Sequence, residues 1–249
     1  MTPTTGPAAG HPASGCKHHP ELQPAPRPAC ACQGLLRPRR MHALGGLWMG
    51  CFLLSHLAIG VSGLSPLAYR GNTDFLRTIL APLPAIALVA IALPLLFQFA
   101  SGLYLLRKEG MKYGVRKCNR GGKLRFFLQR ATGLAILAFT LFHAGTLRGW
   151  GWHNGGLFRN GAAAFGSTVE GFRGFGGGVA VLCLLGIWAA AFHAANGAWS
   201  GGIIWSVAPA PESKRRWGHV CTVIGVVLIA LGTVAWYAFT LSSAARAIS

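Results

Sequence analysis

Long apolar stretches alternate with short polar connections along most of the chain. Five of these stretches approach or exceed the roughly 20 predominantly apolar residues that a helix needs to cross a bilayer. None of them contains Asp, Glu or Lys, and Arg130 is their only arginine. The pattern therefore predicts an all-α integral membrane bundle of five transmembrane helices. The spans lie near Leu44–Leu67, Ile79–Leu106, Phe126–Leu147, Gly178–Trp205 and Trp217–Leu241.

The second span is interrupted by Pro82, Pro84 and Pro94. Proline lacks the backbone donor of a helix and its ring clashes with the preceding turn. We therefore expect this helix to start late or to kink.

Composition and charge agree with a membrane protein. Only 11% of the 249 residues are charged, against about a quarter in soluble domains. The mean hydropathy is +0.45. The net charge of +18 alone would also suit a nucleic-acid-binding protein, but the hydropathy excludes that class, so we expect membrane lipid and no nucleic acid as a partner.

The basic residues orient the predicted bundle. The connections after the second and fourth spans hold 11 Lys and Arg, whereas the opposite connections hold 5. Because positive loops face the cytoplasm, we expect a multi-pass protein of the inner (cytoplasmic) membrane with a cytoplasmic N-terminus. The basic connection after the second span either only sets this topology or also docks a soluble partner.

Residues 1–40 differ from the membrane domain at 41–249. They are rich in Pro, Gly and Ala, which is typical of disorder, so we expect a disordered cytoplasmic tail. The spacing of its cysteines and histidines fits no zinc pattern. These residues are Cys16, His18, His19, Cys30 and Cys32.

Three of the nine histidines fall deep inside predicted spans, namely His56, His143 and His193. A polar side chain at membrane depth is costly and usually functional. One such histidine would most simply hydrogen-bond a neighbouring helix, but three on three helices favour axial ligation of a b-type haem. The chain has no Cys-x-x-Cys-His sequence, which excludes covalently attached haem.

Depth pairs these histidines. At 1.5 Å of rise per residue, His56 and His143 both fall in the outer half of the membrane, where they would hold one haem. His193 falls in the inner half, and its partner should come from the inner half of the second span. Nearby glycines either admit a flat cofactor or let helices pack closely; they are Gly60, Gly133, Gly145 and Gly197.

Four runs of sequence carry a family resemblance. They are Met41–Gly46 with Ser55-His56-Leu57, then Phe97–Tyr104, Gln129–Gly133 and Phe192–Ser200. They resemble the first four helices of the five-helix, di-haem cytochrome b membrane anchor of succinate:quinone oxidoreductase (succinate dehydrogenase or fumarate reductase). The resemblance extends from Met41 to Leu241, and the run around His193 is its most specific part.

The resemblance implies the partners and the chemistry. A flavoprotein subunit would oxidise succinate or reduce fumarate, and an iron–sulfur subunit would exchange electrons with this non-catalytic chain. The chain would carry haem b and pass electrons to or from a quinone, with menaquinone favoured. Arg130 suits a haem propionate or snorkels to the interface, and His42 is a second candidate there. The predicted outer acids, Asp74 and Glu170, are expected to be solvated loop carboxylates.

Gln98 is the one departure, because the family has a haem-ligand histidine at this position. The inner haem is then either absent, with His193 bonded to Gln98, or retained by His193 alone or weakly by Gln98. In a third outcome His42 or His219 takes over, although both lie near the predicted water interface. We favour a changed but retained site, with His193 as ligand and Gln98 as a pocket residue.

Two other classes remain as alternatives. One is the cytochrome b anchor of another membrane oxidoreductase, such as a formate dehydrogenase or hydrogenase, which lacks the runs at Gln129 and Phe192. The other is a non-redox membrane protein, such as a transporter or an assembly scaffold, which would not carry haem.

Overall fold

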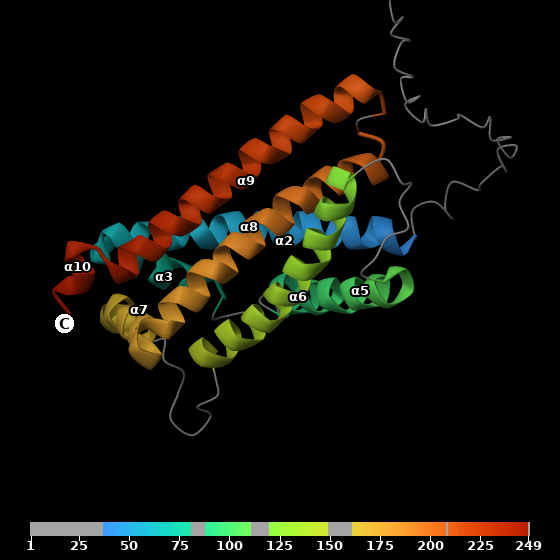
Figure 1. The fold of residues 1–249 in the computed structure, drawn as a ribbon. Coiled ribbons are helices and arrows are strands. Elements are labelled where there is room, and N and C mark those ends of the chain that lie inside the picture. The colour runs from blue at the N-terminus through green and yellow to red at the C-terminus, as the bar shows by residue number, and fades with distance from the viewer. Residues whose placement is uncertain (1–36, 81–87, 111–119, 149–160, 208, 249) are drawn as a thin grey trace, which may run out of the picture.

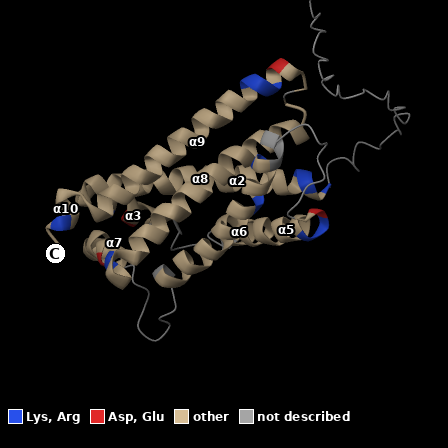
Figure 2. Ribbon diagram, in the orientation of Figure 1, with Lys and Arg blue, Asp and Glu red and all other residues tan. Residues whose placement is uncertain are grey.

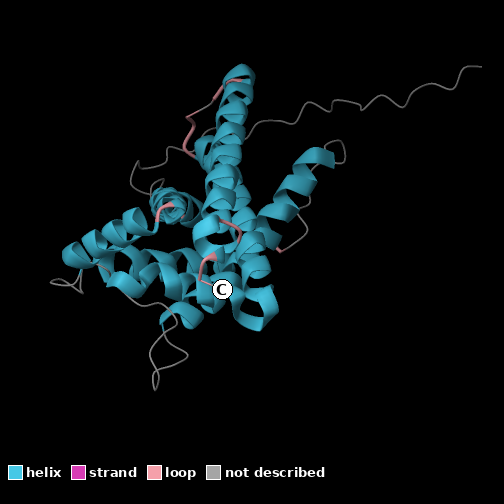
Figure 3. Cartoon of the chain, turned by 90° about the vertical axis from the view of Figure 1, so that its left-hand side faces the viewer, coloured by secondary structure: helices cyan, strands magenta, loops and turns pink. Residues whose placement is uncertain are grey.

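Five long helices lie along one another in the computed structural model (Figure 1), which describes residues 37–80, 88–110, 120–148, 161–207 and 209–248. Each, with its flanking turns, is long and apolar enough to cross a membrane. No strand occurs within these ranges (Figure 3). The predicted all-α bundle of five spanning helices is therefore confirmed. The helices are α2 (Pro38–Val61), α5 (Leu93–Glu109), α6 (Arg120–Arg148), α8 (Gly178–Ile204) and α9 (Pro211–Thr240).

The first helix is shifted from its prediction at both ends. It begins with Pro38 in the first turn, where a missing backbone donor costs nothing, so residues 38–40 of the predicted tail are helical. The rest of that tail lies outside the described residues. The helix passes into the 3₁₀ turn η1 (Ser62–Leu64), and Ser65 is extended, so the predicted end at Leu67 is wrong.

Among the described residues, the second span can be followed from Leu88 onward. Ile79, its predicted start, lies in helix α3 (Pro66–Leu80), and the predicted late start or kink stays a prediction. Residues 81–87, with two of the prolines, lie outside the described residues. A π-helical turn, η2 (Leu88–Ala92), then leads into α5, which has Pro94 in its first turn.

Short helices that the sequence did not predict close one end of the bundle. They are α3, η3 (Gly161–Ala163), α7 (Ala164–Arg173), η4 (Gly174–Gly177) and α10 (Ser243–Arg246). Tyr69 and Phe165 form a buried cluster there with Phe239 of α9, and burial raises the pKa of the Tyr69 hydroxyl. Asp74 and Glu170 lie on α3 and α7, so the expected loop positions are wrong.

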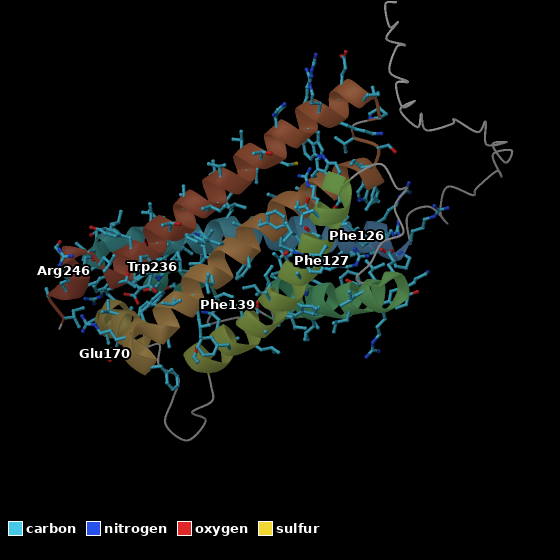
Figure 4. All side chains as sticks on the ribbon, viewed as in Figure 1. Phe126, Phe127, Phe139, Glu170, Trp236 and Arg246 are labelled. Atoms are coloured by element: carbon cyan, nitrogen blue, oxygen red, sulfur yellow. The ribbon has the colours of Figure 1, made fainter. Side chains whose placement is uncertain are left out.

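The fifth span has no histidine deep inside it, which predicts a helix at the periphery of the bundle, but the structure contradicts this prediction. Helix α9 packs along both α8 and α2, where Leu57, Ala191 and Leu228 form a buried cluster. Trp236 of α9, labelled in Figure 4, donates a hydrogen bond to the carbonyl oxygen of Ala180 at 2.8 Å. Small residues at these contacts let the helices approach closely.

Basic residues gather at one end of the bundle (Figure 2). The first turn of α2, the last turn of α5 and the first turns of α9 meet at this end. Their basic residues are Arg39, Arg40, Arg107, Lys108, Lys214, Arg215 and Arg216. This is the end that the loop charges predict to be cytoplasmic.

Candidate haem-binding cavity

A cavity of about 2200 Å³ runs between the long helices. Its lining is mostly apolar and comes from all five of them. Pockets for ordinary small ligands are roughly 300–1,000 Å³, so this cavity has room for more than one large cofactor. The structure brings all six predicted site residues to it: His42, His56, Gln98, Arg130, His143 and His193.

His56 of α2 and His143 of α6 face each other across the cavity. Their ring centres are 6.0 Å apart and their ring planes are nearly perpendicular, at 83°. Phe52 stacks on His56 with ring centres 5.7 Å apart, and Phe139 stacks on His143 at 5.4 Å. Each phenylalanine lies one turn before its histidine and helps to fix the orientation of the imidazole. Phe139, labelled in Figure 4, also packs on Gly186 of α8.

The spacing of this pair fits haem ligation. A metal–imidazole bond of about 2 Å places the ring centre roughly 3 Å from the metal, so two imidazoles on opposite sides of one iron have centres roughly 6 Å apart. The observed 6.0 Å agrees with this value. His56 and His143 therefore fit a bis-imidazole haem.

His193 of α8 is held by a polar network from α6. Its Nδ1 lies 3.2 Å from the hydroxyl of Thr132, and its Nε2 lies 3.2 Å from the amide nitrogen of Gln129. Asn196, which is buried, donates to the Gln129 carbonyl oxygen at 2.6 Å and accepts a bond from Arg125. The motifs around Gln129 and His193 thus interlock and orient the imidazole.

Gln98 contacts a different histidine from the one expected. Its amide nitrogen lies 3.3 Å from Nε2 of His42, whose Nδ1 lies 2.8 Å from the hydroxyl of Ser101. The outcome in which Gln98 bonds His193 is therefore wrong, because the two side chains have other partners. His42 is also half-buried, whereas the sequence placed it close to water.

Arg130 forms an ion pair within the bundle. Its guanidinium donates to Glu109 of α5 at 2.6 Å and lies over the ring of Phe126, labelled in Figure 4. The other carboxylate oxygen of Glu109 accepts from Arg39 of α2 at 2.6 Å. One carboxylate therefore links the start of α2, the end of α5 and the first half of α6.

The described glycines serve close contacts between helices, whereas the predicted role in admitting a flat cofactor stays a prediction. Gly60 serves helix packing, because a Cβ there would lie 2.8 Å from the Cβ of Ala235. Gly133 gives room to a site residue, because a Cβ there would lie 3.0 Å from Cε1 of His193. Gly102 is placed in the same way beside His42, at 3.3 Å.

The sequence reasoning missed several residues of these networks, among them Ser101, Thr132 and Glu109. Ser101 follows Gln98 by three residues, and Thr132 follows Gln129 by three. Residues with this spacing share a helix face, which is the signal that would have found the two hydroxyls. Glu109 lies just past the predicted end of its span.

Two histidines that face one another between apolar helices are the ligand arrangement by which a membrane cytochrome b holds haem. The comparisons point in the same direction. The chain is 28% identical over 210 residues, 81% of its length, to the succinate dehydrogenase cytochrome b558 subunit of Bacillus subtilis (strain 168), of which 95% is covered. This similarity confirms the predicted resemblance to cytochrome b membrane anchors and supports a multi-pass membrane protein. No family model matches the chain, and no solved structure matches it.

Proposed function

We propose that this chain is the haem b membrane anchor of a succinate:quinone oxidoreductase. It carries electrons between an iron–sulfur subunit at the basic end of the bundle and a quinone in the membrane, for which we favour menaquinone. The observation that carries the proposal is the pair His56 and His143, with ring centres 6.0 Å apart on two apolar helices. The named relative supports the same function.

The chain's own residues have distinct roles in this proposal. His56 and His143 hold one haem b, which supplies one-electron transfer when bound, and His193 serves a second haem. Phe52 and Phe139 orient the first pair of imidazoles by stacking. The apolar lining keeps water from the cofactors, and this exclusion of solvent influences their redox potential.

Arg130 is a candidate partner for a haem propionate, and Arg125 is a second one. Both line the cavity. Arg125 lies over the ring of Trp199, with its guanidinium carbon 4.1 Å from the ring centre. Arg130 already shares the Glu109 carboxylate with Arg39, so a propionate there would join an existing charge network.

The flavoprotein and iron–sulfur partners are proposed to dock at the basic end. This end carries the first turns of α2 and α9 and the last turn of α5 (Figure 2). Positive residues at one end orient a membrane protein with that end in the cytoplasm. The N-terminus is then cytoplasmic and the C-terminus lies on the opposite side.

This topology predicts the behaviour of fusions after Ser249. Alkaline phosphatase, which folds only outside the cytoplasm, should be active there, whereas a fluorescent protein that folds only in the cytoplasm should stay dark. Fusions after Ser206, between α8 and α9, are the matched control and should give the reverse result. An active cytoplasmic reporter after Ser249 would overturn the orientation.

The function is tested by isolating the tagged chain from its own membranes in mild detergent. We expect a red preparation with a low-spin haem b spectrum, together with covalent or tightly bound flavin and iron–sulfur clusters, that reduces a quinone with succinate. Haem without these partners, or with formate- or hydrogen-dependent activity, would assign the chain to another oxidoreductase. A colourless preparation would indicate a non-redox membrane protein.

A further inference from the structure

We propose that His42, and not Gln98, provides the axial ligand opposite His193 for the inner haem. The inference rests on the proposed function, since it assumes that the chain carries haem b. It assigns the second ligand to α2, the helix that also carries His56.

The first observation is that His42 and His193 have equivalent surroundings. Ser101 donates its hydroxyl hydrogen to the carbonyl oxygen of Gln98 at 3.2 Å, and so accepts from Nδ1–H of His42 at 2.8 Å. Thr132 donates to the carbonyl oxygen of Leu128 at 2.7 Å, and so accepts from Nδ1–H of His193 at 3.2 Å. Haem and metal ligands commonly have this pattern, in which the second ring nitrogen donates to a fixed partner.

This pattern sets the tautomer of both rings. With the proton on Nδ1, each Nε2 carries the lone pair that binds a metal. In both cases this lone pair faces the amide nitrogen of a glutamine, Gln98 at 3.3 Å and Gln129 at 3.2 Å. His42 thus presents the same donor atom, prepared in the same way, as the histidine that carries the family motif.

The second observation is the depth of His42 in the bundle. Gln98 lies 11 residues before the end of α5 at Glu109, and His193 lies 11 residues before the end of α8 at Ile204. At 1.5 Å per residue, both are roughly 16 Å from the same end of the bundle. Because the His42 ring bonds Gln98, it reaches this depth although its own backbone lies near the start of α2.

The third observation is that His42 and His193 line the same cavity. Glycine stands beside each ring, Gly102 at His42 and Gly133 at His193. The absence of a Cβ at these two positions lets each imidazole ring lie against the neighbouring helix, so the two histidines are accommodated in the same way.

Ligand chemistry separates His42 from Gln98. An imidazole nitrogen is an established axial ligand of haem, whereas a carboxamide oxygen is a poor one. The carbonyl oxygen of Gln98 has no hydrogen-bond partner among the described residues, although it is buried, and it lies against the backbone of Gly45. The hydrogen bond from its amide nitrogen to Nε2 of His42 is 3.3 Å long, more than the usual 2.7–3.2 Å. The amide is therefore readily displaced from the Nε2 lone pair.

The test compares alanine variants in the intact complex, with haem measured against flavin. The unaltered complex should contain two haems, both bis-imidazole by electron paramagnetic resonance. His42→Ala should lose one of them and keep the haem of His56 and His143, which is the internal standard. Gln98→Ala should keep both, as should the control His219→Ala, which removes an exposed histidine at the start of α9.

A ligand replacement distinguishes ligation from a structural role. His42→Met should retain two haems, with one changed to a histidine–methionine spectrum and a higher redox potential. A merely structural His42 would leave both spectra unchanged.

Three results would overturn the inference while the proposed function stands. They are a bis-imidazole inner haem that persists in His42→Ala, an inner haem lost in Gln98→Ala but kept in His42→Ala, and a single haem in the unaltered complex that survives His193→Ala. A complex without any haem would instead overturn the proposed function itself.

Discussion

Replacing His143 by alanine is expected to remove one low-spin haem from the complex and to leave the other in place. His143 and His56 face each other at 6.0 Å between ring centres. Removing either imidazole therefore removes one of the two axial ligands proposed for this haem. Loss of a hydrogen-bond partner of a metal ligand already costs roughly 10–100-fold in affinity or activity. Loss of the ligand itself should therefore exceed 100-fold, and succinate-dependent reduction of menaquinone should fall with it.

The measurement is the haem-to-flavin ratio together with the low-spin resonance signals of the purified complex. His56→Ala should give the same result, because the two residues serve one iron. Thr146→Ala is the matched control on the same helix, since its hydroxyl bonds only the backbone of α6. An unchanged haem content and low-spin spectrum in His143→Ala would show that the pair does not ligate haem.

The sequence predicted the spanning helices well because a bilayer imposes one simple requirement. A helix must be apolar over roughly 20 residues, whatever its neighbours are. The same rule does not detect a helix that is only partly apolar. Helix α3, which carries Arg70 and Asp74 as well as Ile79, was therefore not predicted.

The short helices at the closed end were missed for a different reason. Helices α7 and α10 have 10 and 4 residues, too few to give a clear periodic signal. They are held by tertiary contacts, such as the ring of Phe165 of α7 against Phe239 of α9, with centres 5.5 Å apart, and the hydrogen bond from Arg173 of α7 to the carbonyl oxygen of Ala245 of α10. Such contacts join residues distant in the chain and are not visible in a hydrophobic pattern.

The candidate site was predicted in its residues more than in its connections. The pairing of His56 with His143 followed from depth alone, because both helices rise by the same amount per residue. The hydrogen bond between Gln98 and His42 could not be predicted from depth, since it depends on how α2 and α5 are rotated about their axes. The same applies to Glu109, whose two arginine partners come from different helices.

The second large effect is expected for Asn196→Leu, which breaks the network behind His193. Asn196 is buried, accepts from Arg125 and donates to Gln129 at 2.6 Å. Leucine has nearly the same size but leaves a guanidinium donor and a carbonyl oxygen without a partner. Each buried polar group without a partner lowers the free energy of unfolding by about 1–3 kcal/mol. For a chain of this size, two such groups lower the thermal midpoint by about 4 °C or more.

The same substitution should also disturb the cofactor, because Gln129, whose amide also donates to the backbone carbonyl oxygen of His193 at 3.3 Å, loses its bond to Asn196. We expect a shifted redox potential or a partial loss of the inner haem, while the haem of His56 and His143 keeps its spectrum. Ser200→Ala is the control, one turn further along α8, where the hydroxyl bonds only Gly197 of its own helix. Thermal unfolding and redox titration of the two purified complexes make the comparison. If Asn196→Leu matches Ser200→Ala in midpoint and in both haem potentials, the network does not position His193.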